Sequence, residues 1–365
     1  RPASALTSDD RKVVDSATAR AVEIFSTSRG NQVVKMQAAM ALAASAHELR
    51  MDAQAYLREL MSGNDAPTAT IAATMFWLVG DEPSGNAIEN GLNSGNRQTK
   101  ADAALLAGLT GNNRYLIDVR RLLNDPAPEI FPSAAKAIAR LDDRDSLPAL
   151  YDGIRELSED EEEGRVVALT IMGGSEVHQR LLSMLPDARG NEWFRIVRVL
   201  HNLGDEQATE LLKTNAINQP AFDRQTALIL IEQNAPEAVA FMRAFLDKPL
   251  DPVADNLVYK GQVGIALYEA GDIQAKGIVQ DVLGTSPNLI YARGRNNDQQ
   301  FKEQQVVEIQ TKVSTHIGNT LNREFVTLLA VPVQSPNPTV SVQACIAALQ
   351  IANPEFGLRV REASR

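Results

Sequence analysis

A repeat of 31 residues constrains the fold of this chain more than any other feature of its sequence. Residues that favour a turn recur at this interval, and each separates an alanine-rich apolar stretch from a second amphipathic stretch. These residues are Gly80, Gly111, Asp142, Gly173 and Gly204. Glycine adopts a positive φ at a helix C-terminus without steric cost, and aspartate does so at a modest cost. Such a repeat is typical of arrays in which stacked units share one continuous core.

Apolar residues keep the same interval on both sides of the turn. The upstream columns are Ala73, Ala104, Ala135, Val166 and Val197, and Phe76, Ala107, Ile138, Leu169 and Leu200. The downstream columns are Ile88, Val119, Leu150, Leu181 and Leu212, and Leu92, Leu123, Ile154, Leu185 and Ala216. Apolar positions three and four residues apart lie on one face of a helix. Each repeat is therefore predicted to be a helix, a tight turn and a second helix.

The turn position continues outside the five regular repeats at changed intervals, at Ala46, Asn234 and Gly271. The residues inserted before Gly271 include two prolines, which predict an irregular segment over 249–259. Alanine is frequent and aromatic residues make up only 5% of the chain. Small side chains let helix axes approach closely, so we expect a core built with few aromatics.

Two stretches, 199–212 and 137–150, resemble the HEAT-like repeat of the phycobilisome-lyase type, and 266–272 is similar. The resemblance covers roughly residues 35 to 285, and residues 341 to 360 show a weaker resemblance to the same repeat. It implies a right-handed α-solenoid, an α–α superhelix of about nine or ten hairpins whose second helices line the concave face. It implies little about function, because HEAT-like arrays serve as scaffolds, regulatory subunits, chromophore lyases and adaptors.

We therefore predict an all-α chain in which residues 1–365 form a single HEAT-like solenoid. Its parts are an N-terminal cap at 1–35, regular repeats at 36–285, and an irregular loop with C-terminal capping helices at 286–365. Ser8 is predicted to cap a helix over 9–25, because serine favours that position and acidic residues follow it. Further helices are expected over 301–329, 340–351 and 354–362, with a rigid connector at 331–338.

The composition limits the classes of partner. The chain carries 36 basic and 46 acidic residues, a net charge of −10, which argues against nucleic acid as a partner. The longest apolar run, residues 71–79, is too short for a membrane span, so none is expected. The one cysteine, Cys345, excludes an internal disulfide and any zinc site with several cysteines. It lies in an apolar helix pattern and is predicted to be buried and structural.

Motifs that carry catalysis or bind cofactors are missing or poorly supported. The four histidines do not form a zinc-binding motif, and no glycine-rich phosphate loop or nucleophile elbow occurs. Ser133 and Lys136 have the Ser-x-x-Lys spacing of some serine acylases, but Ser133 follows Phe131-Pro132 where a helix is expected to begin. We therefore predict no catalytic residue, no metal and no cofactor.

Two irregular segments allow two interpretations each. The acidic run at 158–164 is predicted to open a helix, with Ser158 as its cap, and the alternative is a docking site for a basic partner or a weak cation site. The polar loop at 284–300 carries Arg293 and Arg295 and is interpreted as a connector or as a contact region.

The leading hypothesis is a non-catalytic scaffold or adaptor that binds a protein partner on the concave face. The predicted partner-binding residues are Glu89, Arg120, Arg121, Asp152, Arg155, Glu210, Lys213, Arg293 and Arg295. The alternative is a lyase- or chaperone-type enzyme subunit that holds a small molecule in a pocket lined by Trp77, His201 or Tyr268. A third possibility is a homodimer formed through the ends of the solenoid.

The compartment is less constrained. The sequence begins at Arg1 without an initiating methionine, arginine outnumbers lysine and alanine is frequent. These features favour an exported, periplasmic bacterial protein, and a cytoplasmic location is the alternative.

Overall fold

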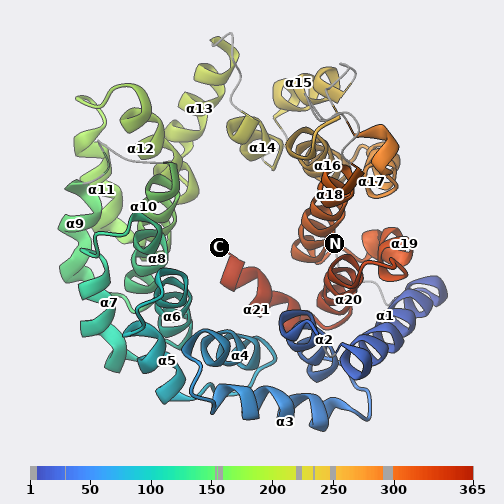
Figure 1. Cartoon of the computed structure of the whole chain (residues 1–365). Helices are drawn as coiled ribbons and strands as arrows, with labels where there is room; N and C mark the ends of the chain where they lie inside the picture. The colour runs from blue at the N-terminus through green and yellow to red at the C-terminus, as the bar shows by residue number, and fades with distance from the viewer. Residues whose placement is uncertain are drawn as a thin grey trace. The chain divides into compact units, whose positions relative to one another are not determined.

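The computed structural model describes residues 6–28, 30–152, 154, 159–218, 224–232, 235–246, 252–290 and 299–364, and side chains at 159–163, 216–218, 224, 225 and 232 are left aside. This part of the chain forms α-helices and short 3₁₀ helices and contains no strand (Figure 1). The predicted all-α class is confirmed for it. The chain divides into two compact units. Unit 1 comprises residues 1–57, 78–80 and 222–364, and unit 2 comprises 58–77, 81–221 and 365.

Unit 2 contains most of the five predicted repeats, although the first turn, at Gly80, belongs to unit 1. Its helices alternate as the 31-residue interval predicts, and the boundary between the units falls within α3 (Arg50–Met61) and α4 (Ala66–Leu78). The first helices of the next four repeats are α6 (Arg97–Thr110), α8 (Phe131–Arg140), α10 (Glu159–Met172) and α12 (Gly190–Asn202). The second helices are α5 (Gly85–Leu92), α7 (Leu116–Leu122), α9 (Leu147–Asp152), α11 (Gly174–Met184) and α13 (Glu206–Asn218).

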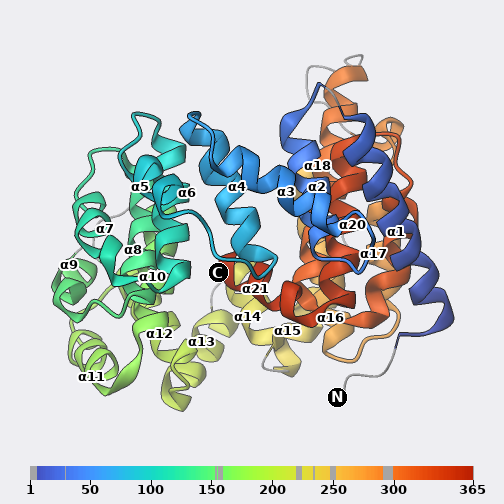
Figure 2. The same ribbon diagram turned by 90° about the horizontal axis from the view of Figure 1, so that it is seen from below.

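First helices of consecutive repeats pack against one another in unit 2. Helix α6 contacts α8, α8 contacts α10, and α10 contacts α12 (Figure 2). The columns that pack between them are buried, as predicted: Ala73, Ala104, Ala135, Val166 and Val197 are all at most 1% exposed. Helices α6, α8, α10 and α12 thus cover one another's apolar faces in chain order.

The predicted turn residues adopt the backbone conformation that the repeat requires. Positive φ occurs at Gly80, Gly111, Asp142, Gly173, Gly204 and Gly271. Asp142 is the informative member, because it has a φ of 51° and is one of two non-glycine residues with positive φ in the described part of the chain. The same left-handed turn therefore recurs whether or not glycine occupies the position. Ala46, predicted at this position, lies between α2 and α3 and does not have a positive φ.

Small residues allow the close packing in unit 2. A Cβ atom placed on Gly108 of α6 would lie 2.5 Å from the Cα of Ala137 on α8. A Cβ atom on Gly91 would lie 2.6 Å from the Cβ of Ala103. Helices therefore meet through glycine and alanine, and this accounts for a buried core with few aromatic side chains.

Unit 1 has a different construction. Its helices are α1 (Ser8–Thr27), α2 (Gln32–Ala43), α14 (Arg224–Glu232), α15 (Pro236–Leu246), α16 (Ala254–Glu269), α17 (Ala275–Leu283), α18 (Gln299–Thr320), α19 (Ala330–Val333), α20 (Pro338–Ala352) and α21 (Pro354–Ser364). Helices α1, α2 and α18 all pack against α20 (Figure 1). Val13 and Ala17 share one core with Phe325 and Cys345. Segments at opposite ends of the chain thus bury their apolar faces together, which the repeat interval does not predict.

Three local predictions are corrected. Thr7, rather than Ser8, caps α1, because its side chain accepts from the Asp10 N–H at 3.2 Å while Asp10 accepts from the Thr7 N–H at 2.9 Å. This reciprocal pair satisfies two backbone donors. The segment at 249–259 is not irregular throughout, since α16 begins at Ala254, after the second proline. The predicted connector at 331–338 contains most of α19, where Pro332 lies in the first turn and no intrahelical N–H donor is needed.

Candidate partner-binding surface

Six of the predicted partner-binding residues lie on second helices of unit 2. Glu89 lies on α5, Arg120 and Arg121 lie on α7, Asp152 ends α9 with an exposed side chain, and Glu210 and Lys213 lie on α13. Arg155, Arg293 and Arg295 lie outside the described residues. Ser158, the predicted cap of the acidic run, lies outside the described residues, and the run is described from Glu159, where α10 begins.

Arg120 forms hydrogen bonds with acidic residues of the neighbouring repeat. Its Nε donates to Asp143 Oδ2 at 2.6 Å, its Nη2 donates to the other Asp143 oxygen, and Nη2 also contacts Asp145 at 3.0 Å. The Asp143 side chain is only 3% exposed and accepts from the Ser146 hydroxyl at 2.6 Å. The hydrogen bonds from Arg120 lower the pKa of Asp143, and the same contact raises the pKa of Arg120. Arg120 therefore stabilises the junction between repeats.

Arg121 and Glu89 also contact other repeats, but both remain open to solvent. Arg121 donates to Asn93 at 3.0 Å and pairs with Asp118 at 3.1 Å, with 61% of its side chain exposed. Glu89 pairs with Arg114 at 3.0 Å, and each of these side chains is about half exposed. Exposed pairs of this kind contribute little to stability, so their groups can exchange one partner for another.

Glu210 and Lys213 form a local ion pair at 2.8 Å within α13. Glu210 is 70% exposed. Lys213 also lies near His201, whose pKa is lowered first by burial and then by the positive charge of Lys213. His201 contacts the Thr209 hydroxyl at 2.8 Å through Nδ1, which gives it a packing role within the hairpin.

The acidic residue directly after the turn position is a structural feature that the sequence analysis missed. Asp143, Asp205 and Asp272 each accept a hydrogen bond from a basic side chain in the preceding second helix. The basic partners are Arg120, His178 and Arg243. Asp205 also accepts from the Ala208 N–H at 2.9 Å, and this bond is the largest cause of its lowered pKa. The signal was available, because these aspartates follow the turn residues in the sequence.

Buried arginines in α12 were also missed. Arg195 and Arg198 are 3% and 5% exposed, in a stretch that the apolar columns assign to the core. The Nη1 atom of Arg195 donates to the Ile154 carbonyl at 2.9 Å, beyond the end of α9. These charges therefore serve the packing of the hairpins.

Exposed apolar side chains accompany the charged ones on the second helices. Ile117 on α7 is 80% exposed, while Leu182 on α11 and Leu211 on α13 are 39% and 37% exposed. Ile117 and Arg121 are four residues apart on α7 and therefore lie on the same face of that helix. This pair places an apolar anchor beside an accessible guanidinium.

The Cys345 thiol and possible clusters of metal ligands are the groups that could carry other chemistry. Cys345 is fully buried, as predicted, and burial raises the pKa of its thiol to about 12. Within the described residues, no group of three or more His, Cys, Asp or Glu side chains could hold a metal ion. The same part of the chain has no helix with the length and apolar character needed to cross a bilayer.

No model of a protein family matches the chain, and no curated protein matches it at a significant level.

Proposed function

We propose that the chain is a right-handed α-solenoid of HEAT-like hairpins that acts as a protein-interaction scaffold. The succession of contacts from α6 to α8, α10 and α12 supports this architecture for unit 2. The recurring positive φ of the turn residues supports equal repeats. An array of this kind presents one helix of every hairpin on a common extended surface.

The partner binds the second helices of unit 2, with α7 at the centre. Ile117, 80% exposed and one helical turn from Arg121, is the observation that carries this assignment. Interface centres are enriched in arginine and in apolar groups that lose their water on binding. Asp118 and Asn93, which contact Arg121 in the free chain, provide polar groups around this centre.

The contacts of the charged side chains support a division of their roles within this proposal. Arg120 is 39% exposed, but the buried carboxylate of Asp143 holds its guanidinium, so we assign it to positioning the surface. Arg121, Glu89, Asp152 and Glu210 are exposed and remain in the proposed surface. A charge reversal at Arg120 would disturb the repeat junction as well as the surface, so it is a poor test of binding.

A better test replaces exposed apolar residues. Ile117→Glu changes the proposed centre, and Val331→Glu is the matched control, because Val331 is 72% exposed but lies on α19 in unit 1. After quantitative affinity capture from the native source, we expect Ile117→Glu to reduce recovery of the specific partner at least about tenfold, an effect of roughly 1.4 kcal/mol. Val331→Glu should retain that partner.

Equal recovery by both variants would exclude α7 from the interface. Equal loss by both would show that added negative charge, rather than the position of the substitution, controls capture. Thermal unfolding followed by circular dichroism confirms that both variants fold.

A further inference from the structure

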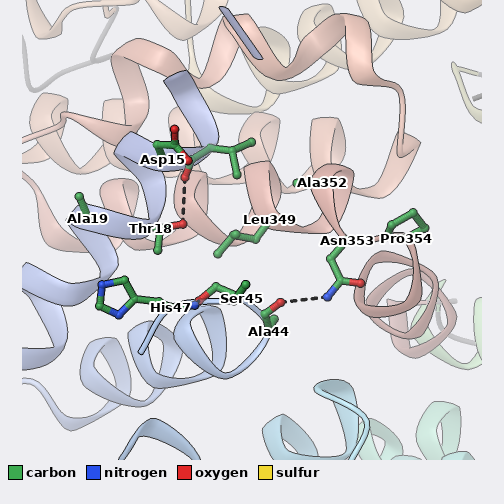
Figure 3. A pocket seen from close by; sticks show the side chains of 12 residues that line it. Asp15, Thr18, Ala19, Ala44, Ser45, His47, Leu349, Ala352, Asn353 and Pro354 are labelled. Atoms are coloured by element: carbon green, nitrogen blue, oxygen red, sulfur yellow. Dashed lines mark hydrogen bonds between the residues drawn. The ribbon is translucent and has the colours of Figure 1, made fainter. Parts of the chain in front are cut away.

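We propose that unit 1 contains a binding site for a small organic ammonium ion, independent of the surface proposed in unit 2. The site is a pocket of about 700 Å³, within the usual range for small-molecule sites. Three segments form it: one side of α1, residues 44–47 after α2, and the junction of α20 and α21 (Figure 3). Its lining is mostly apolar.

The walls of the pocket are fixed by hydrogen bonds within the protein. Asn353 Nδ2 donates to the Ala44 carbonyl at 2.9 Å, while its Oδ1 accepts from the Phe356 N–H at 3.3 Å. The Ser45 hydroxyl donates to the Leu42 carbonyl at 2.8 Å and accepts from the His47 N–H at 3.2 Å. These groups join the segment after α2 to the α20–α21 junction and hold the pocket in shape before any ligand binds.

Asp15 and His47 provide polar groups that remain available to a ligand. Asp15 is exposed at the pocket, and its carboxylate has no hydrogen bond or ion pair within the described residues. His47 accepts from the Leu49 N–H at 3.1 Å through Nδ1, so its Nε2 carries a proton and can donate. Figure 3 shows Asp15 and Thr18 on α1 across the pocket from Ser45 and His47.

The Thr18 hydroxyl does not add a free donor. It donates to the Val14 carbonyl at 3.0 Å, within its own helix. The described residues that line the pocket therefore offer the Asp15 carboxylate, the His47 N–H donor and apolar surface from residues such as Leu349 and Ala352. None of these described lining residues is a lysine or an arginine.

This combination selects the charge of the ligand. A carboxylate attracts a protonated amine and repels an anion, and the net charge of −10 raises the local concentration of cations. The apolar lining favours a hydrocarbon or aromatic body behind the ammonium group. A group that accepts a hydrogen bond, such as a hydroxyl or a ring face, can meet His47 Nε2.

The test compares three probes that share a phenyl ring and a short linker. They are 2-phenylethylamine, which is a cation, 2-phenylethanol, which is neutral, and phenylacetate, which is an anion. Titrations of the intact chain followed by NMR give a dissociation constant for each. We expect millimolar binding of the amine, at least threefold weaker binding of the alcohol, and still weaker binding of phenylacetate.

Variants locate the site and identify the carboxylate. Asp15→Asn should weaken binding of 2-phenylethylamine about three- to tenfold. Asp9→Asn is the matched control on α1, because Asp9 is exposed, pairs with Lys12 at 2.8 Å and does not line the pocket. Ala19→Trp, at an exposed position of the lining, should block all three probes without a change in the unfolding transition.

Four results with the probes and the aspartate variants would overturn the proposal. They are no binding of the amine up to about 20 mM, equal affinity for amine and alcohol, tighter binding of phenylacetate, and equal weakening by Asp15→Asn and Asp9→Asn. Binding that survives Ala19→Trp would place the amine elsewhere on the chain and would also exclude this pocket.

Discussion

Unit 2 and unit 1 bury their cores in two different ways. In unit 2, α6, α8, α10 and α12 pack against one another in chain order, and contacts such as Arg120 with Asp143 join neighbouring hairpins. In unit 1, α1 and α2 pack on α20, and Arg20 Nε donates to the Ser341 hydroxyl 321 residues away at 3.0 Å. A repeat interval can therefore describe one part of a chain while another part depends on contacts between distant segments.

The chain provides a direct way to observe the two units separately. Both of its tryptophans, Trp77 and Trp193, belong to unit 2, whereas helices occur in both units. Tryptophan fluorescence therefore follows unit 2, and far-ultraviolet circular dichroism follows the whole chain. Comparison of the two signals tests whether a substitution acts on one unit alone.

Among these substitutions, Phe325→Ala in unit 1 is expected to lower the free energy of unfolding the most. Phe325 is fully buried in the core shared by α1 and α20. Removal of a buried aromatic ring costs about 3–5 kcal/mol. The circular dichroism transition should gain an early phase while the fluorescence transition stays in place. A parallel shift of both signals would show that the units unfold together.

Gly108→Val should destabilise unit 2, so that the tryptophan fluorescence transition is the one that shifts. The new side chain would meet the backbone of Ala137 on α8, since even a Cβ atom lies 2.5 Å from its Cα. Forced overpacking of this kind costs about 1–3 kcal/mol. The fluorescence midpoint in urea should fall. Gly95→Val serves as the control, because a Cβ atom at Gly95 meets nothing within 4 Å.

Asp143→Asn should have a smaller effect that depends on pH. The hydrogen bonds from Arg120 lower the pKa of Asp143 in the folded state, so the contact stabilises unit 2 above the pKa of the unfolded carboxyl, about 3.9. This contribution disappears as the pH falls through the lower folded-state value. At pH 7 the variant should melt roughly 2–4 °C below the parent chain.

The difference between the two melting temperatures should shrink as the pH falls below about 4. Fluorescence-detected melting at pH 7 and at acidic pH measures it. A constant difference would show that the protonation of Asp143 does not control the stability of this junction.

The smallest effect on stability is expected from Ile117→Glu, the substitution that should have the largest effect on binding. Its side chain is 80% exposed, and substitutions at such positions usually change stability by less than about 0.5 kcal/mol. A large destabilisation in the fluorescence melt would mean that Ile117 supports the fold of unit 2.

The same contrast explains what could be predicted from sequence. The turn residues, including Asp142, and the buried columns follow from short-range spacing, because a helical hairpin imposes its geometry on neighbouring residues. The contact of Ala17 with the α20 core carries no periodic signal, since nothing in the spacing relates residues more than 300 positions apart. The pocket at Asp15 and His47 exists only through that contact and was not foreseen.

Arg120 shows a second limit of prediction from sequence. Spacing places it on a second helix, and the sequence analysis predicts that it binds a partner. Its partner Asp143 lies in the turn of the next repeat. Whether Arg120 is paired or free therefore depends on how the two hairpins pack. Helix periodicity predicts on which face of its own helix a residue lies. It does not predict which group of a neighbouring repeat that residue will contact.

The packing of α1 on α20 has a consequence for synthesis on the ribosome. Translation at about 5–20 residues per second separates the appearance of these two helices by roughly 15–65 seconds. During that interval α2 can pack on α1, but Val13 and Ala17 lack the C-terminal helices that cover them in the finished chain, whereas α6, α8, α10 and α12 meet one another in chain order. The emerging N-terminal helices are therefore the part of the nascent chain most in need of a chaperone.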